Sequence, residues 1–295
     1  SSVYHANKER TDVSVLQNIP RNHGFEFNFP IDAGNYWLKF VVNNKNNTNN
    51  TILGPYPVTV TTPLTGTVTL TSQSGIVTLG NGATLTGTGG ENTHVTIAAG
   101  ATVTFSDVDI TNYNRHEEGE LPSFITCQGD ATIILAKGTT NTIIGGQYLT
   151  PCIQVGPQNT TLTIKGYGTL VLRSWGWGSC IGGRPKQACG NIVIKGGTLD
   201  LSTKIEYQEQ TLSAYAACIG SSGNGSSCGD ITISGGNIRA ESSFGAAAIG
   251  SGRGGTCGNI TITGGTIYTK SRYSLGGSAI GGGLNGVCGD ISISG

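Results

Sequence analysis

Methionine is absent from this chain of 295 residues, and charged residues make up only 12% of it. The 17 basic residues equal the 17 acidic residues in number, so the formal net charge at pH 7 is zero. A nucleic-acid-binding protein needs a basic stripe that neutralises phosphates, and the sequence has none. We therefore expect no nucleic-acid partner.

Long apolar runs are also absent. None approaches the roughly 18 residues that a membrane-spanning helix requires, so we expect no membrane insertion. Low charge, the absence of methionine and an abundance of Thr, Asn and Gly are more typical of a secreted or surface protein than of a cytosolic enzyme. We expect an extracellular or cell-surface location.

Proline is scarce and glycine abundant, with 9 and 48 residues respectively. The glycines do not recur at every third position, which excludes a collagen-like chain. Ile, Val, Leu and Thr alternate between the glycines, and a disordered linker would not show that alternation. The composition therefore indicates short strands joined by many tight turns.

One segment recurs four times, each time opening on Cys-Gly. The copies are CGNIVIKGGTLDL, CGDITISGGNIRA, CGNITITGGTIYT and CGDISISG, which begin at Cys189, Cys228, Cys257 and Cys288. A second landmark, Cys-Ile-Gly or Ala-Ile-Gly, begins nine or ten residues before each copy, at Cys180, Cys218, Ala248 and Ala279. Such self-similarity indicates a repeat architecture.

Within each copy the apolar residues alternate with polar ones. Ile231 and Ile233 are expected to point inward and Thr232 outward, with a Gly-Gly corner after them. Strands this short bury their apolar face only when equivalent strands stack above and below. The sequence therefore predicts an all-β fold, a right-handed parallel β-helix (a solenoid) over residues 63–295. Because Gly295 stops inside a repeat, we expect the chain to be a truncated piece of a longer protein.

The first part of the chain has a different texture. Aromatic-rich alternating runs at Phe25 to Phe29 and Tyr36 to Val42, with a third run at Tyr56 to Val60, predict strands. A β-helix end exposes unpaired backbone, so a cap is expected there. We interpret residues 1–62 as a small β-sandwich-like (immunoglobulin-like) fragment or as a capping segment.

Cysteine occupies two columns of the repeat. The Cys-Gly column always holds Cys, whereas the other holds Cys152, Cys180 and Cys218 and then Ala248 and Ala279. Replacement by Ala indicates a position for a small apolar side chain, so we expect buried thiols, with disulfides as the alternative. No Cys-x-x-Cys pair with a nearby His completes a zinc site, and we expect no metal and no cofactor.

Aromatic residues recur before the Cys-Ile-Gly landmark and in the variable loops. On a β-helix these rings can stack along the rod, and flat rings suit sugar faces. A packed aromatic stack beneath the loops is the structural alternative. The residues that we assign to ligand binding are Trp175, Trp177, Tyr215, Phe244 and Tyr273, with Arg184, Lys186 and Arg253 as polar contacts in the adjoining glycine loops.

Acidic chemistry has one candidate region. Asp107 and Asp109 share a strand face, and the loop from Asn114 to Glu120 is densely charged, so the region could hold an acid pair or Ca²⁺. A solvated loop explains the same residues. No Ser-His-Asp signature, P-loop or dinucleotide fingerprint is present, and we assign no catalytic residue.

Several motifs together carry a resemblance to a known class of protein. They are SFITCQGDATIIL from Ser123, TLTIKGYGTL from Thr161, CIGG from Cys180 and CGNIVIKGGTL from Cys189. In order and in residue pattern, these motifs resemble the β-helix repeat regions of large bacterial cell-surface proteins, over residues 66–295. The resemblance implies a pectin-lyase-like superfold and an adhesin-like or carbohydrate-binding role, with no catalytic motif to carry over. The chain departs from that pattern at Ser179-Cys180 and Ala217-Cys218, which leaves the redox state of this cysteine column open.

Our interpretation is a non-enzymatic surface or secreted adhesin-like protein that presents one side of a β-helix to a glycan or to another partner on a host or cell surface. A polysaccharide lyase or glycoside hydrolase is the first alternative, and a passive structural stalk is the second. Fold alone does not choose among them.

Overall fold

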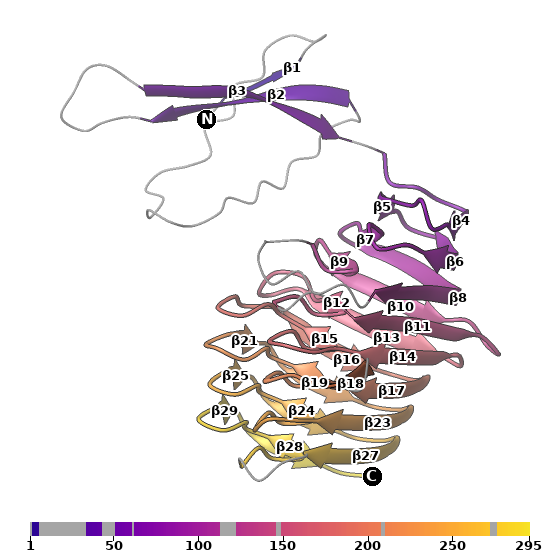
Figure 1. Cartoon of the computed structure of the whole chain (residues 1–295), viewed down its shortest axis with the longest axis vertical. Coiled ribbons are helices and arrows are strands. Elements are labelled where there is room, and N and C mark those ends of the chain that lie inside the picture. Colours follow the sequence, from indigo (N-terminus) through magenta and orange to yellow (C-terminus); the bar gives the residue numbers. More distant parts are fainter. Residues whose placement is uncertain are drawn as a thin grey trace. The chain divides into compact units, whose positions relative to one another are not determined.

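A computed structural model describes residues 2–5, 34–42, 51–60, 62–112, 122–145, 149–207, 210–271 and 276–295 (Figure 1). Every regular element in these ranges is a β-strand, so they hold no helix that could cross a membrane. The chain divides into two compact units, Ser1–Thr62 and Pro63–Gly295. The fold is therefore all-β, as the sequence predicted.

The first unit contains an antiparallel sheet in the order β1-β2-β3. Its strands are β1 (Ser2–His5), β2 (Gly34–Val42) and β3 (Thr51–Val60). The run from Phe25 to Phe29 lies outside the described residues.

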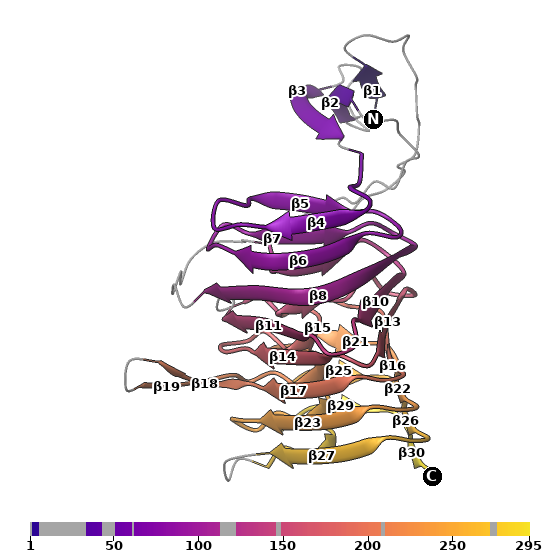
Figure 2. The ribbon, with the colours of Figure 1, turned by 90° about the vertical axis from the view of Figure 1, so that its right-hand side faces the viewer.

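The second unit is a parallel β-helix whose largest sheet has 14 strands. The long strand β8 pairs with both β10 and β11, and from there the sheet continues as two arms, which Figure 2 shows as stacked rungs. One arm consists of β10 (Ala131–Leu135), β13 (Thr161–Gly166), β16 (Asn191–Ile194), β22 (Ile231–Ile233), β26 (Ile260–Ile262) and β30 (Ile291–Ile293). The other consists of β11 (Thr140–Gly145), β14 (Thr169–Arg173), β17 (Thr198–Ser202), β23 (Asn237–Ser242) and β27 (Thr266–Ser271); the first coils add β4 (Thr67–Leu70), β6 (Thr84–Gly89) and β8 (Ala101–Asn112).

Smaller sheets complete the coils. A parallel sheet of eight strands consists of β5 (Ile76–Leu79), β7 (His94–Ile97), β9 (Ile125–Cys127), β12 (Ile153–Gln154), β15 (Ile181–Gly182), β20 (Ile219–Gly220), β24 (Ile249–Gly250) and β28 (Ile280–Gly281). A sheet of three short strands consists of β21 (Ser227–Cys228), β25 (Thr256–Cys257) and β29 (Val287–Cys288). The hairpin of β18 (Lys204–Tyr207) and β19 (Gln210–Ser213) projects from the stack (Figure 2).

The register of the parallel strands places similar residues of neighbouring coils opposite one another. Ile231 pairs with Ile192 of the preceding coil and with Ile260 of the following one. Ile231 and Ile233 are fully buried and Thr232 between them is half-buried, which confirms the predicted alternation. Burying one such side chain contributes about 1.5–3 kcal/mol, and the stack repeats that gain in every coil.

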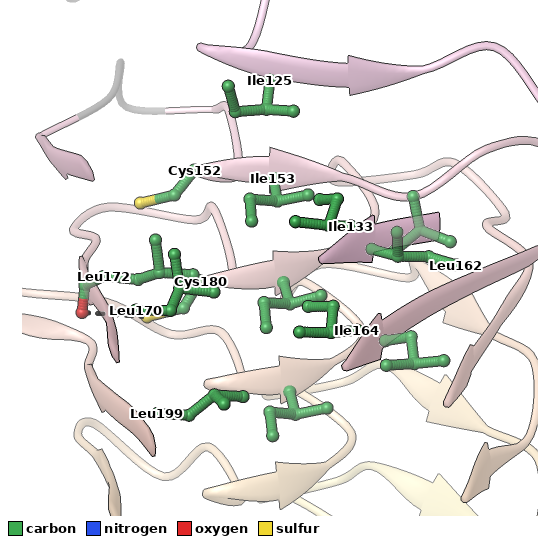
Figure 3. Packing of buried hydrophobic residues seen from close by; sticks show 14 of the residues in the cluster. Ile125, Ile133, Cys152, Ile153, Leu162, Ile164, Leu170, Leu172, Cys180 and Leu199 are labelled. Atoms are coloured by element: carbon green, nitrogen blue, oxygen red, sulfur yellow. Dashed lines mark hydrogen bonds between the residues drawn. The ribbon is translucent and has the colours of Figure 1, made fainter. Parts of the chain in front are cut away.

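The core fills the space inside the coils with columns of Ile, Leu, Val and Cys (Figure 3). Ile153 lies in register with Ile125 in one coil and Ile181 in the next. Cys152 and Cys180 extend this apolar packing, and both are fully buried. The thiol therefore serves as a small core side chain in this column.

The cysteines follow the sequence interpretation except at the C-terminal end. Six thiols are free and buried, and burial raises the pKa of the Cys127 thiol to about 12, so it stays protonated. Cys257 and Cys288 instead form a disulfide, the outcome that we had held as the alternative. The register of β25 and β29 permits this bond, because it brings their Cα atoms to 4.5 Å from each other, within the range that a disulfide requires. The register also places Cys228 opposite Cys257, but the Cys228 thiol stays free.

Candidate functional site

Three aromatic rings from successive coils lie in one column. The ring centroids of Trp177 and Tyr215 are 4.4 Å apart with an interplanar angle of 24°, so these rings stack. The centroid of Phe244 is 5.3 Å from that of Tyr215, at an angle of 44°. All three side chains are half-buried, so the column combines internal packing with an accessible side.

The repeat register explains this column. Trp177 and Tyr215 each stand three residues before the cysteine of the Cys-Ile-Gly landmark, so they occupy equivalent places in their coils. The Tyr215 amide donates a hydrogen bond of 2.8 Å to the carbonyl of Gly176, which holds the two loops in contact. Phe244 is displaced by one position along its loop, and its ring consequently tilts against that of Tyr215.

A guanidinium group from the following coil joins the rings. Arg253 lies in the loop between β24 and β25, and its Cζ is 5.5 Å from the centroid of the Tyr215 ring. Its backbone amide also donates a hydrogen bond of 2.9 Å to the carbonyl of Tyr215. A cation over an aromatic face contributes about 0.5–2 kcal/mol, so the contact helps to hold both side chains in place.

These side chains border a groove of about 350 Å³, which we call the aromatic groove. Successive loops form its other wall, because Asn224 donates a backbone hydrogen bond of 2.9 Å to the carbonyl of Arg253. Rings, amides and one cation thus converge on a single hollow. The lining residues are Trp177, Tyr215, Asn224, Gly225, Arg253, Gly254 and Asn285.

Sequence reasoning had found Trp177, Tyr215 and Arg253 but had missed the two asparagines. Asn224 and Asn285 stand in equivalent loops between the Ile-Gly and Cys-Gly landmarks, as Arg253 does. Both have positive φ, +59° and +56°, which asparagine tolerates better than most residues. The recurrence of a short glycine-rich loop before each Cys-Gly landmark was the signal that could have identified them.

The other predicted binding residues lie elsewhere. Trp175 is only 4% exposed, so its ring belongs to the interior and we leave it out of the site. Arg184 Nε donates a hydrogen bond of 3.0 Å to Gln154 Oε1 and does not line the groove. Lys186 is exposed in its loop but is not a lining residue either. Tyr273 lies outside the described residues.

The candidate acidic region is described only in part. Asp107 Oδ1 accepts a hydrogen bond of 3.1 Å from the Thr140 amide, and Asp109 Oδ1 accepts one of 3.0 Å from the Thr111 hydroxyl. The loop from Asn114 to Glu120 lies outside the described residues. Across the part of the chain that the structure describes, no group of three or more His, Cys, Asp or Glu residues is arranged to hold a metal ion.

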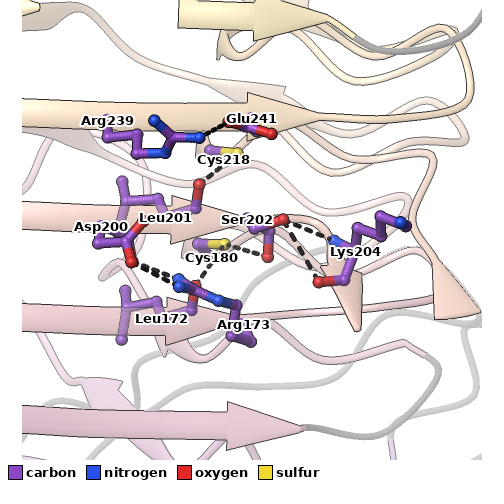
Figure 4. Close-up of polar contacts among 10 residues, drawn as sticks. All are labelled: Leu172, Arg173, Cys180, Asp200, Leu201, Ser202, Lys204, Cys218, Arg239 and Glu241. Carbon is purple, nitrogen blue, oxygen red and sulfur yellow. Dashed lines mark hydrogen bonds and ion pairs between the residues drawn. The ribbon is translucent and has the colours of Figure 1, made fainter. Parts of the chain in front are cut away.

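Two carboxylates on the outer face of the coils form ion pairs (Figure 4). Asp200 Oδ2 is 2.5 Å from Nη2 of Arg173, and Glu241 pairs with Arg239. The Arg173–Asp200 pair is partly exposed and contributes about 0–1 kcal/mol, whereas Glu241 is buried beside an exposed Arg239. These acids therefore have a local structural role: Asp200 of β17 pairs with Arg173 of the neighbouring strand β14, and Glu241 pairs with Arg239 within β23.

Together these features define a parallel β-helix with an aromatic groove built from the loops of successive coils. Comparisons of the chain with protein-family models, with curated proteins and with solved structures find no match.

Proposed function

We propose that this protein is a non-enzymatic, adhesin-like β-helix that binds a glycan through the aromatic groove. The observation that carries the proposal is the meeting of Trp177, Tyr215 and Arg253, from three successive coils, around one groove of about 350 Å³. That volume is within the range of roughly 300–1,000 Å³ that small-molecule sites occupy.

The chemistry of the lining suits a saccharide. The indole and phenol rings offer apolar surface for the C–H face of a sugar, because aromatic rings combine a large apolar area with fixed geometry. Asn224, Asn285 and Arg253 supply amide and guanidinium groups that can hydrogen-bond to hydroxyls. A few polar groups beside apolar walls are the usual composition of a ligand site.

The proposed location is extracellular or on a cell surface. The disulfide between Cys257 and Cys288 supports it, because disulfides persist in oxidising compartments and are rare in the cytosol. The low charge content of 12% and the lack of methionine are in keeping with the same location. Attachment to a host or to another cell is the role that we propose for the binding.

A glycan-array screen of the purified chain tests this function, followed by titration of the strongest ligand. We expect Trp177→Ala and Tyr215→Ala each to weaken binding by at least about tenfold, as buried aromatic contacts at a binding site commonly do. Loss of the Tyr215 ring is compatible with folding, because the equivalent positions of the next two coils are Gly245 and Gly276. Circular dichroism should show unchanged strand content in both variants.

The matched control is Tyr268→Ala, which removes an exposed ring on β27 that does not line the aromatic groove. It should bind like the wild type. If no glycan on the array binds, the proposal fails and a protein-binding adhesin or a stalk takes its place. If a glycan binds equally well to all variants, the binding site is not the aromatic groove.

A further inference from the structure

A second and larger groove follows a corner of the β-helix, where the chain turns from β10, β13 and β16 into β11, β14 and β17. Its volume is about 740 Å³. We call it the corner groove, and it shares no lining residue with the aromatic groove. The lining residues that matter here are Lys137, Lys165, Gly166, Tyr167, Lys195 and Gly236.

The corner is hollow because glycine occupies it in successive coils. A Cβ atom added to Gly166 would lie 2.3 Å from the carbonyl oxygen of Leu135 in the coil before. No side chain larger than hydrogen therefore fits at this position, and the floor of the groove is bare backbone. The corners at Gly196-Gly197 and at Gly236 continue that floor.

Three lysines from three successive coils line this floor. Lys165 and Lys195 follow the in-register pair Ile164 and Ile194, so they are equivalent residues of neighbouring coils, and Lys137 stands at the corner of the coil before. All three are exposed, and no carboxylate is among the lining residues. Asp107 occupies the corner one coil before Lys137 and accepts a hydrogen bond from the Thr140 amide.

This concentration of one sign of charge stands out in a chain whose formal net charge is zero. The fold does not require it, because Ser234 and Thr263 occupy the position of Lys165 and Lys195 in the next two coils. The corner therefore forms in coils that have no lysine at this position.

An aromatic ring lies among the lysines. Tyr167 follows Gly166 at the corner and is 84% exposed, the highest value among the large exposed hydrophobic side chains of the described residues. A single exposed ring is common on protein surfaces, but this one lies in the same groove as three lysines, where its flat face is open to a ligand.

We propose that the corner groove binds an acidic polysaccharide, whose carboxylate or sulfate groups pair with Lys137, Lys165 and Lys195 while a sugar ring packs on Tyr167. Equivalent lysines of neighbouring coils recur at the strand spacing of about 4.8 Å. One pyranose ring advances a polysaccharide by a similar distance. A chain with anionic groups on successive sugars thus matches the repeat of the groove. The inference stands independently of the aromatic groove.

Single-stranded nucleic acid also combines charge with stacking, but its binding surfaces present successive aromatic rings to successive bases. The corner groove has one ring for three coils. The observations therefore favour the glycan.

The test is titration of the full chain by calorimetry with polygalacturonate, heparin, neutral dextran and a single-stranded oligonucleotide. We expect one or both acidic glycans to bind and dextran not to bind. The triple variant Lys137→Gln/Lys165→Gln/Lys195→Gln should lose at least tenfold in affinity. Its affinity should also depend less steeply on salt than that of the wild type, since fewer counterions are exchanged. Tyr167→Ala should weaken binding about threefold or more without changing that salt dependence. Polygalacturonate and heparin distinguish carboxylate from sulfate recognition.

The charge-matched control is Lys270→Gln on β27, which lies outside the corner groove and should bind within about twofold of wild type, as distant surface charges act only weakly. Lys165→Gln alone, by contrast, should produce a clear loss. Unchanged binding in the triple variant, absence of binding to both acidic glycans, or tighter binding of the oligonucleotide would each overturn the proposal. Trp177→Ala should leave this binding intact, so the result is separate from that for the aromatic groove.

Discussion

At the scale of single residues, Phe244 shows a conflict between backbone and side chain. Its φ is +46°, a region that costs a bulky residue roughly 1–2 kcal/mol. The equivalent residue two coils earlier is Gly176, with φ of +76°, which adopts this turn without strain. The phenyl ring packs against Tyr215, so the contact with the aromatic groove offsets a conformation that glycine would adopt more easily.

Among the described residues, His94 has a lowered pKa that links stability to pH near neutrality. Burial is the main cause that lowers the pKa of its imidazole; the nearby positive charge of Arg184 lowers the pKa further, and a hydrogen bond with the carbonyl of Ser123 opposes both. Its ring also stacks on Phe124, with centroids 6.5 Å apart. The folded state therefore favours neutral His94.

We predict that the β-helix loses stability as the pH falls from about 6.5 through the lowered pKa of His94. In that window the unfolded chain binds a proton that the folded chain resists, so unfolding becomes easier, whereas above it both states are neutral. Thermal unfolding at several values between pH 8 and 5 measures the effect. His94→Gln should show a smaller decrease in Tm over this range; an identical decrease would rule out His94 as the origin.

At the scale of the element, the Ile-Gly strands of the eight-stranded sheet depend on close backbone contact. A Cβ atom on Gly220 would lie 1.9 Å from the carbonyl oxygen of Gly250 in the next coil, and the φ of Gly220 is +131°. Gly225 also has a positive φ, +73°, but nothing lies within 4 Å of its Cβ position. Alanine substitutions at these two glycines therefore separate the cost of backbone strain from the cost of a steric clash.

We predict that Gly220→Ala destabilises the protein by more than about 3 kcal/mol, because strain and a clash with backbone act together. Gly225→Ala should cost only about 1–2 kcal/mol, since conformational strain acts alone. Urea unfolding of both variants gives the comparison. Equal costs would mean that neighbouring coils move apart readily at this sheet.

At the scale of the whole molecule, the β-helix unit carries its own core. The buried cluster extends from Leu70 to Ile262, and each coil pairs with the coils before and after it. The boundary between the two compact units falls between Thr62 and Pro63. Stability in such a stack is close to a sum of terms within coils and between neighbours.

We predict that a chain of residues 63–295 folds without residues 1–62. Its circular dichroism should keep the strand signal of the β-helix, and its thermal midpoint should lie within about 5 °C of the full chain measured in parallel, equivalent to roughly 1–2 kcal/mol. A fragment that binds a hydrophobic dye and unfolds without cooperativity would show that the first unit is needed for folding.

The sequence by itself determined the fold class, the position of the coils and the inward residues. The Cys-Gly and Ile-Gly landmarks recur at nearly constant spacing, and the alternation at Ile231, Thr232 and Ile233 specifies which face is buried. This succeeds because each coil repeats the same local solution, so that equivalent residues must stack.

Only the tertiary structure decided which side chains meet at a site. Trp175 and Trp177 are two residues apart, yet one is interior and the other lines the aromatic groove. The pairing of Cys257 with Cys288, the part of Asn224 in the groove wall and the line of lysines at the corner also depend on how loops and corners stack. Repeat periodicity predicts which residues are equivalent, whereas exposure depends on the side chains of neighbouring coils, which differ from one repeat to the next.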